Sequence, residues 1–300
     1  MSSFKIARYR TIPYGTSLNR FFFYLIKLSL LSLIVLSTPH TQTFAQTPDP
    51  ELMSDEELVD ALMQASGFDL SLLDVWYGID ESIHADPELA SGEASKVRQL
   101  LRSGFYGDRL VSAYRNRLSR DLDQTNAIRV IAFLQSETGQ HILEKETQEA
   151  NATDAELQDF ATGFDLQDDS NSIRVELVQT IMSETRAMEN TTAILHALYS
   201  NLLLTANAAE NGVASRMSDS EFEATSGLIR SQLDQQIGQY IIISMLYTFR
   251  DADISHLEMY IEHLLSDAGR WYTSTLHDIL IEVLEDAHQT VRNEIRLTDS

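Results

Sequence analysis

The sequence predicts an all-α fold, an internally duplicated helical bundle that follows an N-terminal signal peptide. All five prolines lie at or before Pro87, and glycine is sparse after Gly107, whereas a β-rich chain would need many turns built from these residues. Apolar residues recur at helical spacing along the chain. The segment from Arg120 to Gly139 also returns as the segment from Arg250 to Gly269, which indicates that one helical unit occurs twice.

Residues 1–45 have the layout of a secretory signal peptide. Five basic residues and no acidic residue lie in this leader, and the apolar run 28–36 follows the last of them. Thr43 and Ala45 are small residues at the positions that a signal peptidase reads, and cleavage after Ala45 would leave Gln46 as the first residue. The apolar run is shorter than the about 20 residues that a transmembrane helix needs. An uncleaved N-terminal membrane anchor is the alternative, and we expect no stable transmembrane segment after cleavage.

Residues 46–53 form a polar linker with two prolines, after which the helices begin. Ser54, Thr153 and Ser218 are each followed by glutamate three residues later, which is the pattern of a capping box. In that motif the serine or threonine oxygen binds a backbone N–H that the helix leaves free. We therefore expect a helix from Ser54 to about Ser66, and two further helix starts.

The middle of the chain reads as a long helical pair, residues 170–188 and 191–208. Residues 211–217 are the clearest internal loop, with Gly212 as a suitable C-cap for the preceding helix. Residues 240–247 are β-branched and aromatic, and alone they would suit a strand. We assign them to the helix that opens at Ser218, because a lone strand would leave its backbone groups unpaired.

The repeated segment has identical residues at a constant offset of 130 positions. Aspartates near its start are suitable N-caps for the helix that follows. On that helix Ile254, Leu257, Ile261 and Leu264 form one apolar seam, and three of the four positions are apolar in the first copy as well. The identical pairs are Arg120 and Arg250, Asp121 and Asp251, Asp123 and Asp253, Ile131 and Ile261, Leu134 and Leu264, Ser136 and Ser266, and Gly139 and Gly269.

A Ser-x-x-Gly pattern follows each seam, at Ser136 with Gly139 and at Ser266 with Gly269. The serine is expected to cap the next helix by accepting the N–H of the glycine. Glycine in a first helical turn costs about 1 kcal/mol against alanine, and we expect close approach of the preceding helix in return. The pattern thus predicts a sharp corner between helices. Anion binding at the helix start is the alternative.

The last predicted helix runs from about Arg270 past Val291, with apolar residues on one side and acidic residues on the other. Two repeat units follow from these elements, residues 54–150 and residues 151–300. No linker-like composition separates them, so we expect both units to pack as one domain.

Composition excludes several classes of function. The chain carries 45 acidic against 22 basic residues, a formal net charge of −23, which disfavours binding to nucleic acid. Cysteine is absent, so disulfides, thiolate catalysis and cysteine metal sites are excluded. No phosphate-binding glycine loop, nucleophile elbow or zinc-protease motif is present. We therefore expect no cofactor.

Two motifs together are similar to the bacterial DUF2059 family. They are an aromatic pair before an acidic helix start, and an aromatic residue ahead of a Ser-x-x-Gly corner before the last helix. The first copy has the aromatic residue of the corner, whereas the second copy has His263 there. The resemblance implies an exported helical bacterial protein and no established activity. The residues that carry it, which we expect to be structural, are Tyr247, Phe249, Asp251, Ser266, Gly269, Asp121, Phe133, Ser136 and Gly139.

Histidine offers the remaining candidate chemistry. Glu285 with His288 has the i, i+3 spacing of di-iron helical bundles, and Asp253 with His256 is the nearest second pair. A copper site is suggested by His256 together with Met259 and His263, because copper accepts imidazole and thioether ligands. The two histidines of that set lie two turns apart, about 10 Å, too far for one ion to bridge them directly, and an amphipathic helix edge is the interpretation that we prefer.

The sequence as a whole predicts a protein exported to the periplasm of a Gram-negative bacterium. Because a packing motif is duplicated and no catalytic set is recognisable, we expect a non-catalytic role. The expected partner is a protein or a small apolar ligand, bound in a groove between the two motif helices. The alternative is a helical metalloenzyme or metal-binding protein that uses carboxylate and histidine ligands.

Overall fold

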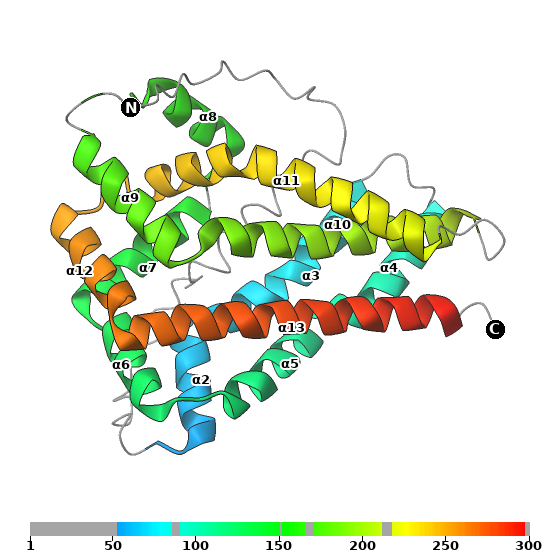
Figure 1. The fold of residues 1–300 in the computed structure, drawn as a ribbon, viewed down its shortest axis with the longest axis horizontal. Coiled ribbons are helices and arrows are strands. Elements are labelled where there is room, and N and C mark those ends of the chain that lie inside the picture. The colour runs from blue at the N-terminus through cyan, green and yellow to red at the C-terminus, as the bar shows by residue number, and fades with distance from the viewer. Residues whose placement is uncertain are drawn as a thin grey trace.

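The computed structural model describes residues 53–85, 91–150, 152–165, 168, 171–211 and 218–297, and these residues form helices and no strand, as predicted (Figure 1). The helices are α2 (Asp55–Ser66), α3 (Phe68–Ala85), α4 (Ser91–Phe105), α5 (Gly107–Arg120), α6 (Gln124–Leu134), α7 (Glu137–Ala150), α8 (Asp154–Gly163), α9 (Ser172–Glu184), α10 (Ala187–Asn211), α11 (Asp219–Thr248), α12 (Ile254–Leu265) and α13 (Asp267–Leu297). None of the described helices is long and apolar enough to cross a membrane.

The three predicted capping boxes are present. Ser54, Thr153 and Ser218 are the N-caps of α2, α8 and α11, and each accepts the backbone N–H of the glutamate three residues later. Each glutamate carboxylate in turn accepts the N–H of its cap residue, at 2.6 to 2.9 Å. Such a cap stabilises a helix by typically about 1 kcal/mol, so these three starts follow from local chemistry alone.

Three long helices, α10, α11 and α13, lie side by side along the molecule (Figure 1). Residues 240–247 lie inside α11, as predicted, and Ile241 and Leu246 are fully buried. The predicted loop at 211–217 is described only at Asn211, the last residue of α10; the rest, Gly212 included, lies outside the described residues.

The boundary between α9 and α10 differs from the prediction. The first helix ends at Glu184 and the next begins at Ala187, so the break falls a few residues before the predicted one. Arg186 between them has φ of 52°, in the left-handed region. A residue there cannot continue a right-handed helix, and the chain turns at that point. The last helix likewise begins at Asp267, slightly before the predicted start.

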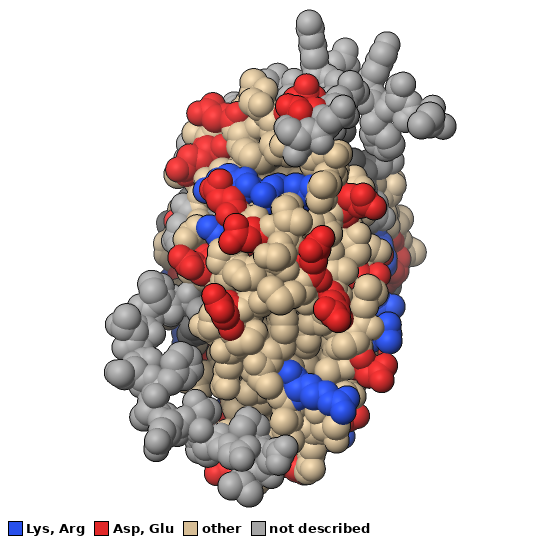
Figure 2. Space-filling model, turned by 90° about the vertical axis from the view of Figure 1, so that its left-hand side faces the viewer, with Lys and Arg blue, Asp and Glu red and all other residues tan. Residues whose placement is uncertain are grey.

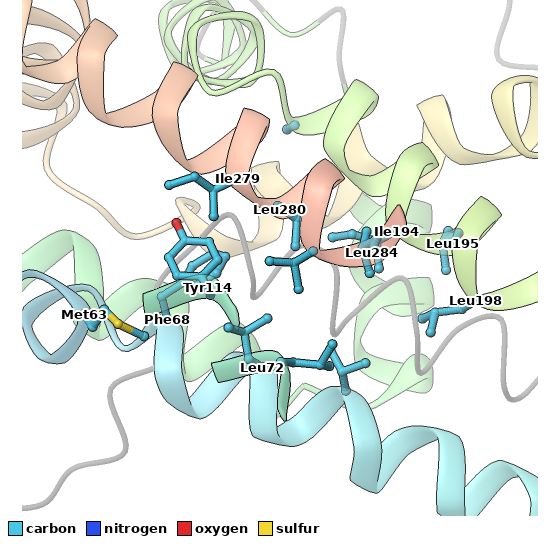
Figure 3. Packing of buried hydrophobic residues seen from close by; sticks show 14 of the residues in the cluster. Met63, Phe68, Leu72, Tyr114, Ile194, Leu195, Leu198, Ile279, Leu280 and Leu284 are labelled. Atoms are coloured by element: carbon cyan, nitrogen blue, oxygen red, sulfur yellow. The ribbon is translucent and has the colours of Figure 1, made fainter. Parts of the chain in front are cut away.

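One hydrophobic core joins elements from both predicted repeat units. Phe68, Leu72 and Tyr114 point toward Ile279 and Leu280 of α13 (Figure 3). The ring of Phe68 packs on that of Tyr114 with centroids 4.3 Å apart. Helix α13 contacts α4, α5 and α6 of the first unit as well as α10 of its own unit, so the last helix links the two units.

The two Ser-x-x-Gly corners have matching geometry. The Ser136 hydroxyl donates to the carbonyl oxygen of Phe133 at 2.6 Å and accepts the N–H of Gly139 at 3.1 Å. In the second corner Ser266 makes the same pair of bonds at 2.6 and 3.0 Å, the latter from Gly269. The predicted capping role of both serines is confirmed. Since each glycine N–H already binds its serine, it is not available to an anion.

The aspartates before the two repeated helices differ in detail. Asp123 is the N-cap of α6, and its carboxylate accepts the N–H of Asn126 at 3.0 Å. Asp253 holds the N-cap position of α12 without a side-chain cap bond. Asp121 instead ends α5 as its C-cap. Each repeated helix thus has its N-cap at the second of the two predicted aspartates, Asp123 in α6 and Asp253 in α12.

The two corners also exchange partners. Helix α6 packs on α13, and α12 packs on α7, so the first helix of each corner contacts the second helix of the other. Phe133 and His263 occupy equivalent positions, and their rings stack with centroids 3.8 Å apart and planes inclined by only 3°. Equivalent residues meet in this way only near a local two-fold axis. The corners are thus arranged as an approximate two-fold pair.

Candidate functional site

A groove of about 940 Å³ runs between α10, the first half of α11 and α13. Small side chains on α10 keep it open: Ala193 and Ala197 are one helical turn apart and both line it. Its apolar surface also includes Phe222 of α11 and Leu284 of α13, each at least nine-tenths buried. Ligand sites in proteins typically have volumes of about 300 to 1,000 Å³, so the groove is of that size.

Two histidines of α13 enter the groove at matched positions. His277 binds Asn190 of α10 through Nδ1, and His288 binds Asn201 through Nδ1 at 2.9 Å. The two partners are 87 positions apart in both pairs, and both contacts form because α10 and α13 run parallel (Figure 1). Within each helix the two residues are eleven positions apart, which is three turns or about 16 Å.

The asparagines set the orientation of the two imidazoles. Asn190 and Asn201 are buried, and the amide nitrogens donate to the carbonyl oxygens of Thr185 at 3.1 Å and Ala197 at 2.6 Å. Each amide oxygen is then left to accept, so the histidine Nδ1 must carry the proton. The other ring nitrogen, Nε2, therefore has a free lone pair.

Burial lowers the pKa of both His277 and His288, and a nearby arginine adds to the effect in each case, Arg186 for the first and Arg292 for the second. A lowered pKa keeps an imidazole neutral at neutral pH. The groove thus offers two hydrogen-bond acceptors whose orientation is held by buried amides.

A polar chain closes one side of the groove. Nε2 of His196 lies 2.8 Å from the hydroxyl of Ser226, which lies 2.9 Å from the hydroxyl of Ser200. A serine beside a histidine suggests a nucleophile, but Ser226 lies in the interior of α11. Backbone N–H groups there are already bound to carbonyls one turn earlier, so they cannot stabilise an oxyanion. These three hydrogen-bonded side chains therefore serve as a polar link between α10 and α11.

Charged side chains surround the His288 end of the groove. The His288 ring stacks on Phe222 with centroids 5.8 Å apart, and the Arg292 guanidinium lies over the same Phe222 ring at 5.6 Å. Glu223 and Glu285 line the groove near them and are exposed. This end of the groove is polar, in contrast to its alanine and leucine floor.

The residues that carry the resemblance described above lie outside the groove and serve packing. Phe249 is fully buried, and the Tyr247 ring carries the Arg250 guanidinium at 3.7 Å and the edge of Phe160 at 5.4 Å. Asp251 is exposed beside Arg250 at 3.4 Å. Together with the two corners, these residues shape the junctions between helices.

The cavity between the motif corners is small. It measures about 40 Å³, and Phe133, Tyr260, His263 and Tyr272 are among the residues around it. A water molecule needs at least about 10 to 15 Å³ by this kind of measure, so the space suits a few waters. A hollow of ligand size lies instead along α10, α11 and α13.

The metal candidates do not gather into one site. Glu285 and His288 lie at the groove, whereas Asp253 and His256 begin α12. Within the described part of the chain, no three histidine, aspartate or glutamate side chains come together as a metal site would require. His263 stacks on Phe133 at the two-fold contact, and burial lowers its pKa to about 4.

The groove was not foreseen from the sequence, although one signal for it exists. Asn190 and Asn201 are separated by the same eleven residues as His277 and His288, so two polar pairs match on two long helices. Only the parallel packing of α10 and α13 turns this spacing into contacts. No protein-family model matches the chain, and comparison with curated proteins and with solved structures gave no significant match.

Proposed function

We propose that this protein is a non-catalytic binding protein whose groove along α10, α11 and α13 holds an elongated, mostly apolar small molecule with polar ends. The observation that carries this proposal is the pair of oriented imidazoles, His277 and His288, on the wall of a groove with an apolar floor. Ordering two asparagines and two histidines in this way costs conformational entropy. Ligand binding at the oriented imidazoles would explain why the arrangement is present.

The chemistry of the ligand follows from the lining. The free Nε2 lone pairs accept hydrogen bonds, so hydroxyl or amino groups about 16 Å apart on the ligand match them. Between them the floor of Ala193, Ala197 and Leu284 suits a hydrocarbon portion. An apolar ligand was expected from the sequence, and the groove adds polar contacts at its ends.

We further propose that the chain is exported to the periplasm of a Gram-negative bacterium. Support comes from the leader at residues 1–45, which lies outside the described residues, and from the resemblance to the DUF2059 family. Fractionation with N-terminal sequencing tests this part. A soluble periplasmic chain that starts at Gln46 is expected, and a membrane-bound chain with an intact leader would contradict it.

Filling the groove tests the binding proposal. Ala193→Trp places an indole on the groove floor, and Ala155→Trp on the exposed surface of α8 is the matched control. The probe is a fluorescent amphiphile whose emission rises in apolar surroundings, and native mass spectrometry detects molecules that purify with the protein. We expect the wild type and the control to bind the probe with equal affinity, and the groove variant to bind at least about tenfold more weakly. Equal binding by all three proteins would refute the proposal.

A further inference from the structure

Two histidine rings meet at the interface of α7 and α12, and neither residue lines the groove. The rings of His141 and His256 lie with centroids 4.5 Å apart and planes inclined by 58°. Nε2 of His141 and Nδ1 of His256 are both buried and have no hydrogen-bond partner among the described residues. A buried polar atom without a partner costs about 1 to 3 kcal/mol, so one such atom on each of two neighbouring rings requires an explanation.

A thioether lies on the next turn of the same interface. The Thr138 hydroxyl, one turn before His141, donates to Sδ of Met259 at 3.6 Å, and Met259 is one turn after His256. The two contacting pairs thus step in opposite directions along the two helices, so α7 and α12 are antiparallel here. Met259 and His256 are three residues apart on α12, a rise of about 4.5 Å along the helix axis. Met259 is 42% exposed, and its three rotatable bonds let the sulfur turn toward the rings.

The surroundings of His141 favour its neutral form. Burial lowers the pKa of His141, and His256 and Lys145 lower it further, while Asp253 and Glu144 act in the opposite direction. A neutral imidazole has the lone pair that a metal needs. On the side of the molecule that carries α9 and α12, acidic side chains are spread over the surface (Figure 2), which attracts cations.

We propose that His141 Nε2, His256 Nδ1 and the Met259 thioether bind one soft monovalent metal ion, Cu(I). Zinc sites require three or four histidine, cysteine or carboxylate ligands, and the described residues hold no such group. Two imidazoles and a thioether match Cu(I), which soft sulfur ligands select. The chain has no cysteine, so no thiolate competes for the ion.

The proposed site differs from the set of His256, Met259 and His263 that was considered from the sequence. Helical spacing already placed His263 too far from His256 for one ion to bridge them, and in the structure His263 stacks on Phe133 at the two-fold contact. His141, more than a hundred positions earlier in the chain, takes the place of His263 because α12 packs on α7. The proposal does not depend on the groove or on its ligand.

The test is a titration of the purified protein with Cu(I), under reducing and oxygen-free conditions, against a chromophoric Cu(I) chelator. We expect one ion per chain, and X-ray absorption that shows nitrogen together with one sulfur neighbour. His141→Asn and His256→Asn should each weaken binding at least about tenfold, and Met259→Leu should remove the sulfur signal. His84→Asn, which changes an exposed histidine of α3, is the control and should bind as the wild type does.

Circular dichroism tests whether each variant is folded, and the X-ray absorption spectrum of the wild type tests the ligand set even where a variant fails to fold. Unchanged affinity in both histidine variants would overturn the proposal, as would a spectrum without sulfur. Zn²⁺ bound as tightly as Cu(I), with no effect of Met259→Leu, would overturn the assignment to a soft monovalent ion.

Discussion

Replacing Gly269 with alanine tests the structural role of the repeated corner. An alanine Cβ at this position would lie 2.7 Å from Cα of Leu264 and closer still to the carbonyl oxygen of His263. These are backbone atoms of the preceding helix, so no side-chain rotation can make room. The corner between α12 and α13 would have to open, and the serine bonds that close it would lengthen.

The expected cost can be worked out from two opposing effects. Overpacking a buried position costs typically about 1 to 3 kcal/mol, and the upper end applies here because the obstacle is backbone. Alanine is better than glycine in a helix by about 1 kcal/mol, which offsets part of that cost. We expect Gly269→Ala to lower the free energy of unfolding by about 2 kcal/mol. Gly139→Ala should cost a similar amount, since its Cβ would meet the equivalent backbone atoms.

Urea denaturation followed by circular dichroism measures the change. Gly227→Ala is the matched control, because this glycine also lies within a helix, α11, and has nothing within 4 Å of an added Cβ. The control should be stabilised by up to about 1 kcal/mol. If Gly269→Ala proved as stable as the control, close approach would not be the reason for glycine at the corner.

Three other changes have defined outcomes. Ser266→Ala removes the acceptor of the Gly269 N–H and should lower the free energy of unfolding by about 1 kcal/mol, again measured by urea denaturation. Burial holds the pKa of folded His263 at about 4, below its ordinary 6.5, so the unfolded chain takes up the proton first as pH falls. The stability that neutral His263 contributes is therefore present above pH 6.5 and lost as pH falls through about 4. The variant His263→Phe has no group that titrates there, so its free energy of unfolding should fall less over that pH range in pH-dependent denaturation. Asn201→Ala should abolish the fixed Nδ1–H form of His288, which nitrogen NMR of the ring detects at neutral pH; an unchanged tautomer would show that the amide does not set it.

Much of the fold could be predicted because its signals are local. A capping box needs only four consecutive residues, and all three were found where the pattern placed them. The serine corners were likewise predicted with their hydrogen bonds, since the donor, the acceptor and the glycine lie within one turn. The assignment of residues 240–247 to a helix was also right, although β-branched residues favoured a strand locally, because the chain offered no strand to pair with.

The candidate sites were beyond such reasoning. His277 and His288 meet Asn190 and Asn201 only because α10 and α13 pack in parallel, and no local pattern states the register of two helices. The pairing of His141 with His256 was out of reach for a related reason: periodicity placed His256 and His263 on one side of α12, but it said nothing of which neighbour each would meet. His263 met its own counterpart position, Phe133, across the local two-fold.

By itself the sequence determined that the chain is helical, where several helices begin, and that a serine–glycine corner occurs twice. These features depend on hydrogen bonds and periodicity within a few residues of each other. Only the tertiary structure decided how the corners exchange partners, where a hollow of ligand size lies, and that His141 faces His256. Contacts between distant segments depend on the packing of whole helix surfaces, and that information is spread over the entire chain.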